Sequence, residues 1–312
     1  MRSADRRSPR AARRALPPGL FAAPTLAWLA LFFIAPVGLV FWYSLGRKPG
    51  LYQTHSNDVL TMGRYHEALS DTFLTSFMGT LRIGLAGTAL CLAIGLPFAY
   101  WLAVKVRPQR RFVVLALVLV PFWTNFLIRT IGWQVVLSPE GFASRTMQGL
   151  GLIDKPFSML FTPGAVLLGV VYNYLPMMIL PLYVALDRID GSLREASKDL
   201  GADRWRTALQ ITLPLARPGI VAGLLLVFIP LMGDYVTASV LGGARGNMVG
   251  QLIASQFQQG QNWALGSAMA IVLILVIALT ILATAVAGIA CTWLLTHRRR
   301  RELAGIAEGS PA

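Results

Sequence analysis

Long apolar runs separated by shorter polar segments dominate this chain. Each run holds about 20 or more mostly apolar residues, the length that an α-helix needs to cross the hydrocarbon core of a bilayer. A membrane β-barrel would instead show segments of about 10 residues in which apolar and polar side chains alternate, and the runs do not alternate in that way. The pattern predicts an all-α integral membrane protein with six transmembrane helices. The predicted spans are Leu20–Leu45, Ile83–Val104, Phe112–Leu137, Gly164–Leu186, Pro218–Leu241 and Ala268–Leu295.

Basic residues are concentrated in alternate connections between the predicted spans. The chain carries 28 Lys and Arg against 14 Asp and Glu, a net charge of +14. Twenty of the 28 lie in the tail 1–19, after the second and fourth spans, and after the sixth span. Because such residues mark the cytoplasmic side of a membrane protein, we expect both tails, 1–19 and 297–312, in the cytoplasm. The charge is therefore a topology signal and gives little support to a nucleic-acid partner.

The first apolar run resembles a signal peptide because basic residues precede it. Its 26 residues exceed the roughly 7–15 of a signal peptide's apolar core, so we expect an uncleaved span. The predicted location is the inner membrane of a bacterium, crossed several times.

Motifs for catalysis and metal binding are missing from the sequence. No Gly-Lys dipeptide occurs, so the chain has no Walker A phosphate loop. The segment His66–Ser70 begins like a zinc-protease helix, but Ser70 stands where the second histidine is needed, and three scattered histidines do not make a zinc site. Cys91 and Cys291 each lie in an apolar run and are interpreted as core residues. We expect no enzyme activity, metal or cofactor in this chain.

The segment 187–217, between the fourth and fifth spans, has the pattern of two short amphipathic helices. Apolar or small residues at Ile189, Leu193, Ala196/Ser197 and Leu200 fall on one helical face. Gly201 then provides a left-handed C-cap, and Asp203 an N-cap. A second stripe follows, and Pro214 is expected to end it. The second stripe consists of Trp205, Leu209 and Leu213.

The helix pair has the length to lie either on the lipid surface or against a protein partner. A helix that lies on the lipid surface favours Lys and Arg on its polar face. Here acids balance bases, as Glu195, Asp199 and Asp203 show. Balanced charge together with a tryptophan favours contact with a protein partner.

The same segment resembles the EAA loop of ATP-binding-cassette (ABC) importer permeases. That pattern has Glu-Ala-Ala, a glycine, and Ile-x-Leu-Pro at fixed spacing, and Ser197 for the second alanine is the one departure. In that family the loop docks as a coupling helix into an ATPase subunit, which implies that a dimer of partner ATPases binds Mg-ATP and supplies the energy. The positions that match, with the departure included, are Glu195, Ala196, Ser197, Gly201, Ile211, Leu213 and Pro214.

Two ionisable residues lie deep in predicted spans, where such groups are costly and often functional. At 1.5 Å per residue, Asp234 is about 24 Å and Arg129 about 26 Å from the cytoplasmic end of its span. Their matching depth is consistent with a structural ion pair, and equally with a role in a substrate path; an arginine that snorkels outward is a third interpretation.

Aromatic residues near proline breaks are further candidates for the path. Trp123, Tyr174 and Tyr235 are able to face a cation, although single residues of this kind more often pack or anchor at the interface. Breaks near mid-bilayer free backbone groups that can line a path. The prolines expected to interrupt spans are Pro36, Pro97, Pro121, Pro176, Pro181 and Pro230.

Three longer stretches resemble the spermidine/putrescine branch of ABC permeases, in particular the first of its two permease subunits. They are Pro121–Gly141, Tyr172–Asp190 and Gly233–Gly243. The resemblance implies a polyamine substrate, a second permease subunit, and a periplasmic binding protein that docks on the outer loops. Related permeases carry ferric iron, sulfate or aminophosphonates, and those alternatives stay open. The predicted outer loops are Gly46–Asp71, Ser138–Pro163 and Gly242–Gly266.

The two rival functions are those of a secondary transporter and of a membrane scaffold or channel. A secondary transporter would couple protons through Asp234, but a single intramembrane acid and the EAA spacing argue against it. A membrane scaffold or channel that moves nothing actively leaves the patterned loop 187–217 without a role.

Overall fold

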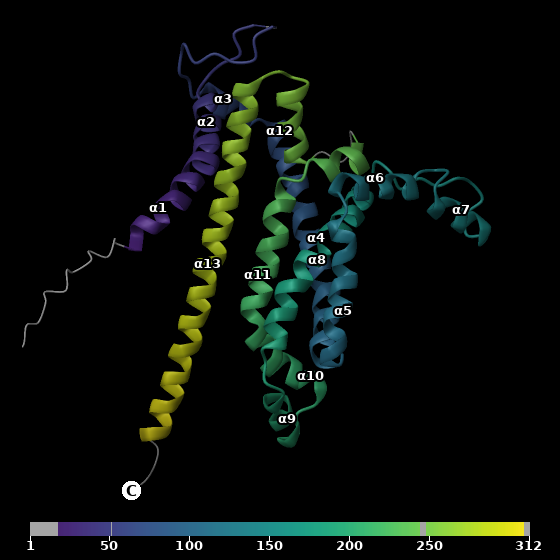
Figure 1. Ribbon diagram of the computed structural model, residues 1–312, viewed down its shortest axis with the longest axis vertical. Coiled ribbons are helices and arrows are strands. Elements are labelled where there is room, and N and C mark those ends of the chain that lie inside the picture. Colours follow the sequence, from purple (N-terminus) through teal and green to yellow (C-terminus); the bar gives the residue numbers. More distant parts are fainter. Residues whose placement is uncertain (1–17, 51, 244–247, 309–312) are drawn as a thin grey trace, which may run out of the picture.

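The computed structural model describes residues 18–50, 52–243 and 248–308. Most of the predicted N-terminal tail, residues 1–17, and the last four residues therefore lie outside it. The described residues form helices joined by short connections, which confirms the predicted all-α fold (Figure 1). The elements are α1 Pro18–Leu29, η1 Ala30–Ile34, α2 Ala35–Ser44, α3 Gly63–Ala68, α4 Asp71–Val104, α5 Pro108–Leu119, η2 Val120–Trp123, α6 Phe126–Leu137, α7 Phe142–Gly149, α8 Pro163–Asp187, α9 Gly191–Asp199, α10 Arg204–Thr207, η3 Ala208–Thr212, α11 Leu213–Met232, η4 Ala238–Gly242, α12 Val249–Gln258 and α13 Trp263–Glu308.

Five described helices are long and apolar enough to cross a membrane, and a bent pair of helices passes the same test when the two are taken together, which gives up to six spans. The predicted fourth span agrees closely with α8. The first corresponds to α1, η1 and α2, and the sixth lies within α13. The other three predicted spans differ from the structure in ways that bear on function.

The third predicted span is not one helix. Residues Pro108–Trp123 and Phe126–Gly149 meet at 86°. Thr124 is extended, and the side chain of Asn125 caps α6 by accepting a hydrogen bond from the backbone N–H of Leu127 at 2.8 Å. Pro121 removes a backbone donor just before the break. Hydropathy does not show this break, because the residues on both sides of it are apolar.

The second and fifth predicted spans have the wrong ends. Helix α4 begins at Asp71 rather than Ile83, because its polar outer turns pack against other helices: the hydroxyl of Thr80 accepts a hydrogen bond from Val249 N–H at 2.8 Å. Helix α11 ends at Met232 rather than Leu241, where Gly233 donates to Pro230 O at 3.2 Å and Asp234 N–H to Leu231 O at 3.1 Å. Asp234 thus follows the helix instead of lying inside it.

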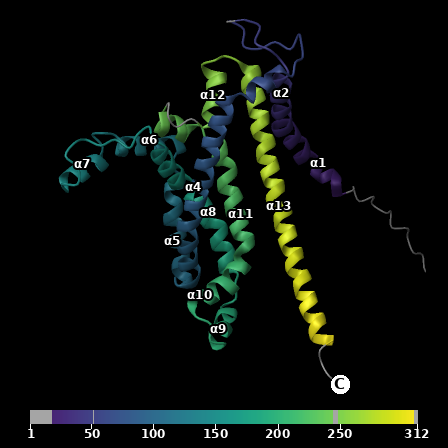
Figure 2. The same ribbon diagram turned by 180° about the vertical axis from the view of Figure 1, so that it is seen from behind.

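Helices α4, α8 and α11 form the core, seen side by side in Figures 1 and 2. Small residues allow their backbones to approach, as in many membrane bundles. Gly219 and Gly223 of α11 face α8, where a Cβ on Gly219 would lie 2.3 Å from the Cβ of Ala185. Cys91 is buried in this core, as predicted, whereas the side chain of Cys291 lies outside the described part of the structure.

We expect Gly219→Ala to destabilise the α8–α11 contact by about 1–3 kcal/mol, because a methyl group has no room there. The melting temperature of the purified protein in detergent should fall. Gly38→Ala is the matched control, since a Cβ at Gly38 in α2 meets nothing within 4 Å. Equal melting temperatures for the two variants would contradict the tight contact.

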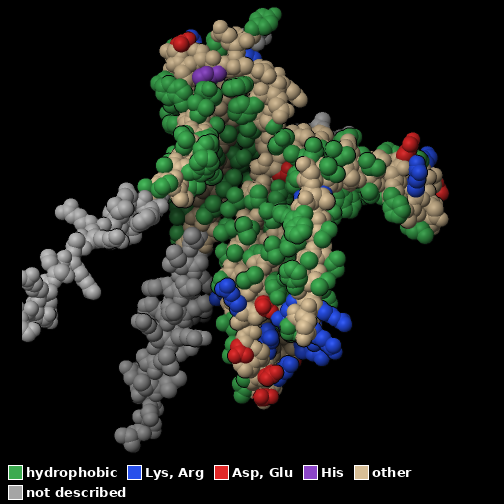
Figure 3. All heavy atoms as spheres, in the orientation of Figure 1, with side chains coloured by type: hydrophobic (Ala, Val, Ile, Leu, Met, Phe, Trp, Pro, Cys, Tyr) green, Lys and Arg blue, Asp and Glu red, His purple; other side chains and the backbone are tan. Residues whose placement is uncertain are grey.

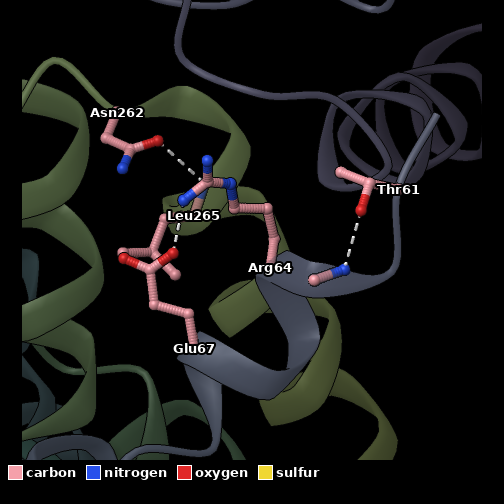
Figure 4. A network of polar contacts seen from close by, with 6 residues as sticks. Thr61, Arg64, Glu67, Asn262 and Leu265 are labelled. Atoms are coloured by element: carbon pink, nitrogen blue, oxygen red, sulfur yellow. Dashed lines mark hydrogen bonds and ion pairs between the residues drawn. The ribbon is translucent and has the colours of Figure 1, made fainter. Parts of the chain in front are cut away.

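A second apolar cluster closes the end of the bundle opposite α9, where α13 meets α3, α12 and the ends of α4 and α11 (Figure 1). Local polar contacts hold the connections there (Figure 4). The hydroxyl of Thr61 accepts a hydrogen bond from Gly63 N–H, Arg64 forms an ion pair with Glu67, and Asn262 Oδ1 accepts from Leu265 N–H at 3.2 Å. These contacts fix the starts of α3 and α13.

Most of the prolines expected to interrupt spans lie within helices. Pro97 lies inside α4, Pro176 and Pro181 inside α8, and Pro230 inside α11; only Pro121 lies at a sharp break. Pro36 and Pro214 each follow a five-residue π-helical segment, η1 and η3. A π-turn widens the helix where a proline has no N–H to donate. The expectation that Pro214 ends the second helix of the 187–217 segment is therefore wrong, since the helix continues into α11.

Candidate functional site

The segment 187–217 folds as the predicted pair of short helices. Asp190 Oδ1 accepts a hydrogen bond from Ser192 N–H at 3.0 Å and caps α9, and that backbone bond lowers the pKa of the Asp190 carboxyl. At the other end, Gly201 N–H donates to Lys198 O at 2.8 Å and Ala202 N–H to Ser197 O at 3.0 Å. This is a Schellman C-cap, and Gly201 has the left-handed φ of +81° that it requires.

A buried hydrogen bond joins the two helices of this segment. The hydroxyls of Ser197 in α9 and Thr207 in α10 lie 3.0 Å apart. Asp203 caps α10 by accepting from Arg206 N–H at 2.6 Å, and the Thr207 hydroxyl lies 3.0 Å from Asp203 O. Ser197, the one departure from the Glu-Ala-Ala pattern, is therefore a contact that sets the angle between the helices.

The solvent-exposed surface of the helix pair is largely apolar. Leu200 is 89% and Trp205 77% exposed, and Leu209 is exposed beside them. Glu195 and Ala196 are exposed on α9. We call these five residues the docking face. The predicted single apolar stripe on α9 is divided in the structure, because Ile189 and Ser197 point inward while Leu200 points outward.

The remaining residues of the pattern lie where the segment joins the membrane helices. Ile211 is in η3, and Leu213 and Pro214 begin α11; all three are partly buried. Charged side chains gather around this end of the molecule, over α9, α10 and the start of α5 (Figure 3). Because α10, η3 and α11 form one continuous helix, a movement of the docking face would pass directly into α11.

A cavity of about 290 Å³ lies beside the break between α5 and α6. The guanidinium of Arg129 lies over the ring of Phe122 at 5.3 Å and over that of Phe126 at 5.7 Å, and its Nη1 donates to Pro121 O at 3.2 Å. Arg129 thus holds the bent span together and also faces the cavity. The lining residues are Phe122, Thr124, Phe126, Arg129, Asn173, Tyr174 and Met177.

Asp234 lies two residues beyond the last residue of α11, is 6% exposed, and has Tyr174 as its neighbour. The carboxylate caps the next helical turn: Oδ1 accepts from Thr237 N–H at 3.0 Å and Oδ2 from the Thr237 hydroxyl at 2.5 Å. Within the described part of the chain, Asp234 and Arg129 form no ion pair. The structural ion pair that the matching depths suggested is therefore not formed, although Tyr174 lies between the two elements that carry these charges.

The aromatic candidates divide into an inner and an outer group. Tyr174 is buried and its ring meets that of Phe126 edge-on at 6.1 Å. Trp123 is 81% exposed, and Tyr235 is exposed on the surface next to Asp234. Arg129 and Tyr174 therefore share the cavity, and Tyr174 is also the neighbour of Asp234, which is not among the lining residues. Trp123 and Tyr235 face outward from this chain.

Asn173 is a polar residue of the cavity that sequence reasoning missed. The hydroxyl of Thr130 donates to Phe126 O at 2.9 Å, so it can only accept from Asn173, whose Nδ2 lies 3.2 Å away. Asn173 Oδ1 is then left buried without a partner among the described residues, as is Nε of Arg129. A buried amide in a span is itself an unusual polar residue, and that was the signal available in the sequence.

This chain is similar to known transport proteins. Residues 95–291 match the sequence pattern of the family described as binding-protein-dependent transport system inner membrane component. The spermidine/putrescine transport system permease protein PotB of Escherichia coli (strain K12) is 37% identical over 260 residues, covering 82% of this chain and 92% of that protein. PotB of Haemophilus influenzae is 38% identical over 255 residues, covering 82% and 88%.

A solved structure shares the fold. The bacterial alginate ABC transporter, crystallised in complex with a periplasmic protein bound to an alginate pentasaccharide, matches with a TM-score of 0.66 at 16% identity. The match covers 85% of this chain and 91% of that one. At this identity the likeness concerns the arrangement of helices alone.

Proposed function

The chain belongs to the family of binding-protein-dependent transport system inner membrane components, and we propose that it carries polyamines of the spermidine and putrescine class as a permease subunit of an ATP-driven importer. The observation that most strongly supports this proposal is the 37% identity to PotB across 82% of the chain. The chemistry of the site supports it. A buried carboxylate at Asp234, with the tyrosines Tyr174 and Tyr235 beside it, suits an ammonium group.

In this proposal, the substrate path runs between this subunit and a second six-span permease. Asp234 would bind a substrate ammonium with Tyr174 beside it, and Arg129 would line the adjoining cavity. Trp123 and Tyr235 face outward from this chain, which is the position required of residues that complete a path with the other permease. A periplasmic binding protein would deliver the polyamine to the outer loops.

The energy would come from two ATPase subunits that bind Mg-ATP and contact the docking face. This chain would supply no hydrolytic residue. An exposed tryptophan and two exposed leucines beside balanced charges are typical of a protein interface. We place this face in the cytoplasm, since basic residues are concentrated there. The C-terminal end of α13 lies at the same end of the molecule (Figures 1 and 2).

Replacing Trp205 with alanine should weaken ATPase binding without unfolding the permease. The side chain is 77% exposed here, so its loss removes little internal packing. A buried interface tryptophan contributes about 2 kcal/mol or more, which corresponds to about thirtyfold in the dissociation constant. Co-purification with the ATPase measures the effect. Phe142→Ala, an equally exposed aromatic on the outer side, is the control, and equal losses for both would exclude Trp205 from the interface.

The substrate is tested by reconstituting the complete importer in liposomes and measuring ATP-dependent uptake of labelled spermidine. Uptake that needs ATP and is inhibited by unlabelled putrescine is expected. A small anion is the second candidate, because the Arg129 guanidinium lines the cavity with Nε unpartnered among the described residues. Uptake of sulfate without uptake of spermidine would favour that alternative. Uptake driven by a proton gradient without ATPase subunits would contradict both.

A further inference from the structure

Helix α5, the inner half of the bent span, is loosely attached to the rest of the molecule. None of its described residues is buried, and large side chains such as Phe112 and Leu117 are exposed. The C-terminal end of α5 leads through η2 into the break at Thr124. Because its apolar side chains, such as Val114 and Leu115, are at most partly buried, polar contacts at its first turn contribute to holding α5 against the rest of the chain.

Arg111 makes those contacts. Its Nε donates to Val106 O at 3.0 Å, just beyond the end of α4, and its Nη1 lies 2.5 Å from Oδ1 of Asp187. Asp187 is the last residue of α8, and only three residues separate it from α9. One arginine therefore joins the end of α4, the start of α5 and the first residue of the segment 187–217, which we call the docking segment, across 76 positions of sequence.

The other end of α5 reaches the candidate substrate cavity. Phe122 and Thr124, which directly follow α5, line that cavity. A shift of the 187–217 segment that acts on Asp187 would be transmitted by Arg111 to α5, and by α5 as a rigid helix to the cavity wall. Helix α11 provides a second route for the same movement, because it runs from α10 and η3 to the turn that contains Asp234.

We propose that the Arg111–Asp187 ion pair is a positioning contact that makes α5, and with it the cavity wall at Phe122 and Thr124, follow the movement of the docking segment. The inference rests on the proposed role of that segment as the site of ATPase coupling, and it does not depend on which solute is carried. Arg111 and Asp187 touch neither the substrate nor the nucleotide in this proposal.

The surroundings of the pair determine how it must be tested. Its side chains are 23% and 37% exposed, so solvent and salt weaken the attraction. Several other bases lie close in sequence, among them Arg107, Arg110 and Arg188, and Asp187 can turn to one of them when Arg111 is removed. A double charge exchange, Arg111→Asp with Asp187→Arg, is therefore more informative than a single alanine substitution.

The first measurement is the amount of spermidine taken up per ATP hydrolysed by the complete importer in liposomes. Arg111→Asp and Asp187→Arg should each lower this ratio about three- to fivefold, the range expected for losing a partly exposed ion pair. The double exchange should restore it to near the wild-type value. Arg110→Ala, which changes the loop charge but removes no ion pair among the described residues, should behave as wild type.

The second measurement requires no transported solute. Thr124→Cys, in a background with Cys91→Ala and Cys291→Ala, places a thiol at the cavity wall whose labelling rate by a maleimide can be followed. The rate should differ between the nucleotide-free and vanadate-trapped complexes, and Arg111→Asp should reduce that difference at least threefold, with recovery in the double exchange. A difference that survives both single exchanges would overturn the proposal, as would a double exchange no better than the singles. A wild type that takes up no polyamine, yet shows the labelling difference, would overturn the substrate assignment alone.

Discussion

Replacing Gly201 with valine is expected to abolish most ATP-driven uptake while the protein remains in the membrane. Gly201 has φ +81°, and no atom lies within 4 Å of the position that a Cβ would take. The cost is therefore one of backbone conformation, about 1–2 kcal/mol for an L-residue and more when the side chain is β-branched. Relief of that strain opens the Schellman turn and swings α9 away from α10. Uptake should fall about tenfold or more in the reconstituted importer.

A second glycine provides the control for this experiment. Gly151, in the outer loop after α7, also has a positive φ, of +68°, and open space around it. Gly151→Val carries the same backbone strain far from the docking face and should leave ATP-driven uptake near wild type. Gly201→Asn should keep most of the activity, because asparagine tolerates the left-handed region. If Gly201→Val and Gly151→Val reduced uptake equally, the turn at Gly201 would have no special role in coupling.

Replacing Asp234 with asparagine should lower spermidine uptake about ten- to a hundredfold, because a hydrogen bond to a charged group contributes about 1.5–3 kcal/mol. The substitution keeps the shape of the side chain and an oxygen that can accept from Thr237 N–H, so the cap on the next turn should survive. Assembly, measured by co-purification of the two permeases and the ATPase, should be unchanged. The expected loss of spermidine uptake therefore measures the contribution of the negative charge of Asp234.

Thr237→Val separates the charge of Asp234 from its hydrogen bonds. Valine has nearly the shape of threonine but lacks the hydroxyl that lies 2.5 Å from Asp234 Oδ2. This variant keeps the carboxylate and should retain uptake far better than Asp234→Asn. Loss of assembly in Asp234→Asn would assign the residue a structural role, and normal uptake in the same variant would exclude it from the path.

Local signals in the sequence predicted the docking segment well. Caps depend on a residue and its neighbours three or four positions away, so Asp203 and Gly201 were identified correctly. The same local reasoning failed at Pro214, because the π-turn of η3 lets a proline continue the helix. The departure at Ser197 gained a role only when Thr207, ten residues later, was found to share its hydrogen bond.

The sequence predicted individual residues of the candidate path but not how those residues are arranged in space. Hydropathy identified Arg129 and Asp234 as rare charges in apolar surroundings, but it assumed that both lay in straight helices. The break at Thr124 and the end of α11 at Met232 changed their positions, so Arg129 bonds to Pro121 and the rings beside it, and Asp234 caps a turn. Asn173 lines the cavity because α8 packs against α6, a contact that no local sequence pattern indicates.

By itself, the sequence determined the membrane class, the approximate positions of the apolar spans and the two-helix form of the segment 187–217, since these depend on apolar length and on capping and turn-forming residues close together in the chain. Tertiary structure alone decided where a span breaks, which polar atoms share a cavity, and that Arg111 meets Asp187. The physical reason is that an apolar run has the same hydropathy whether its helix is straight or bent. The contacts of its few polar residues depend on how distant helices pack against one another.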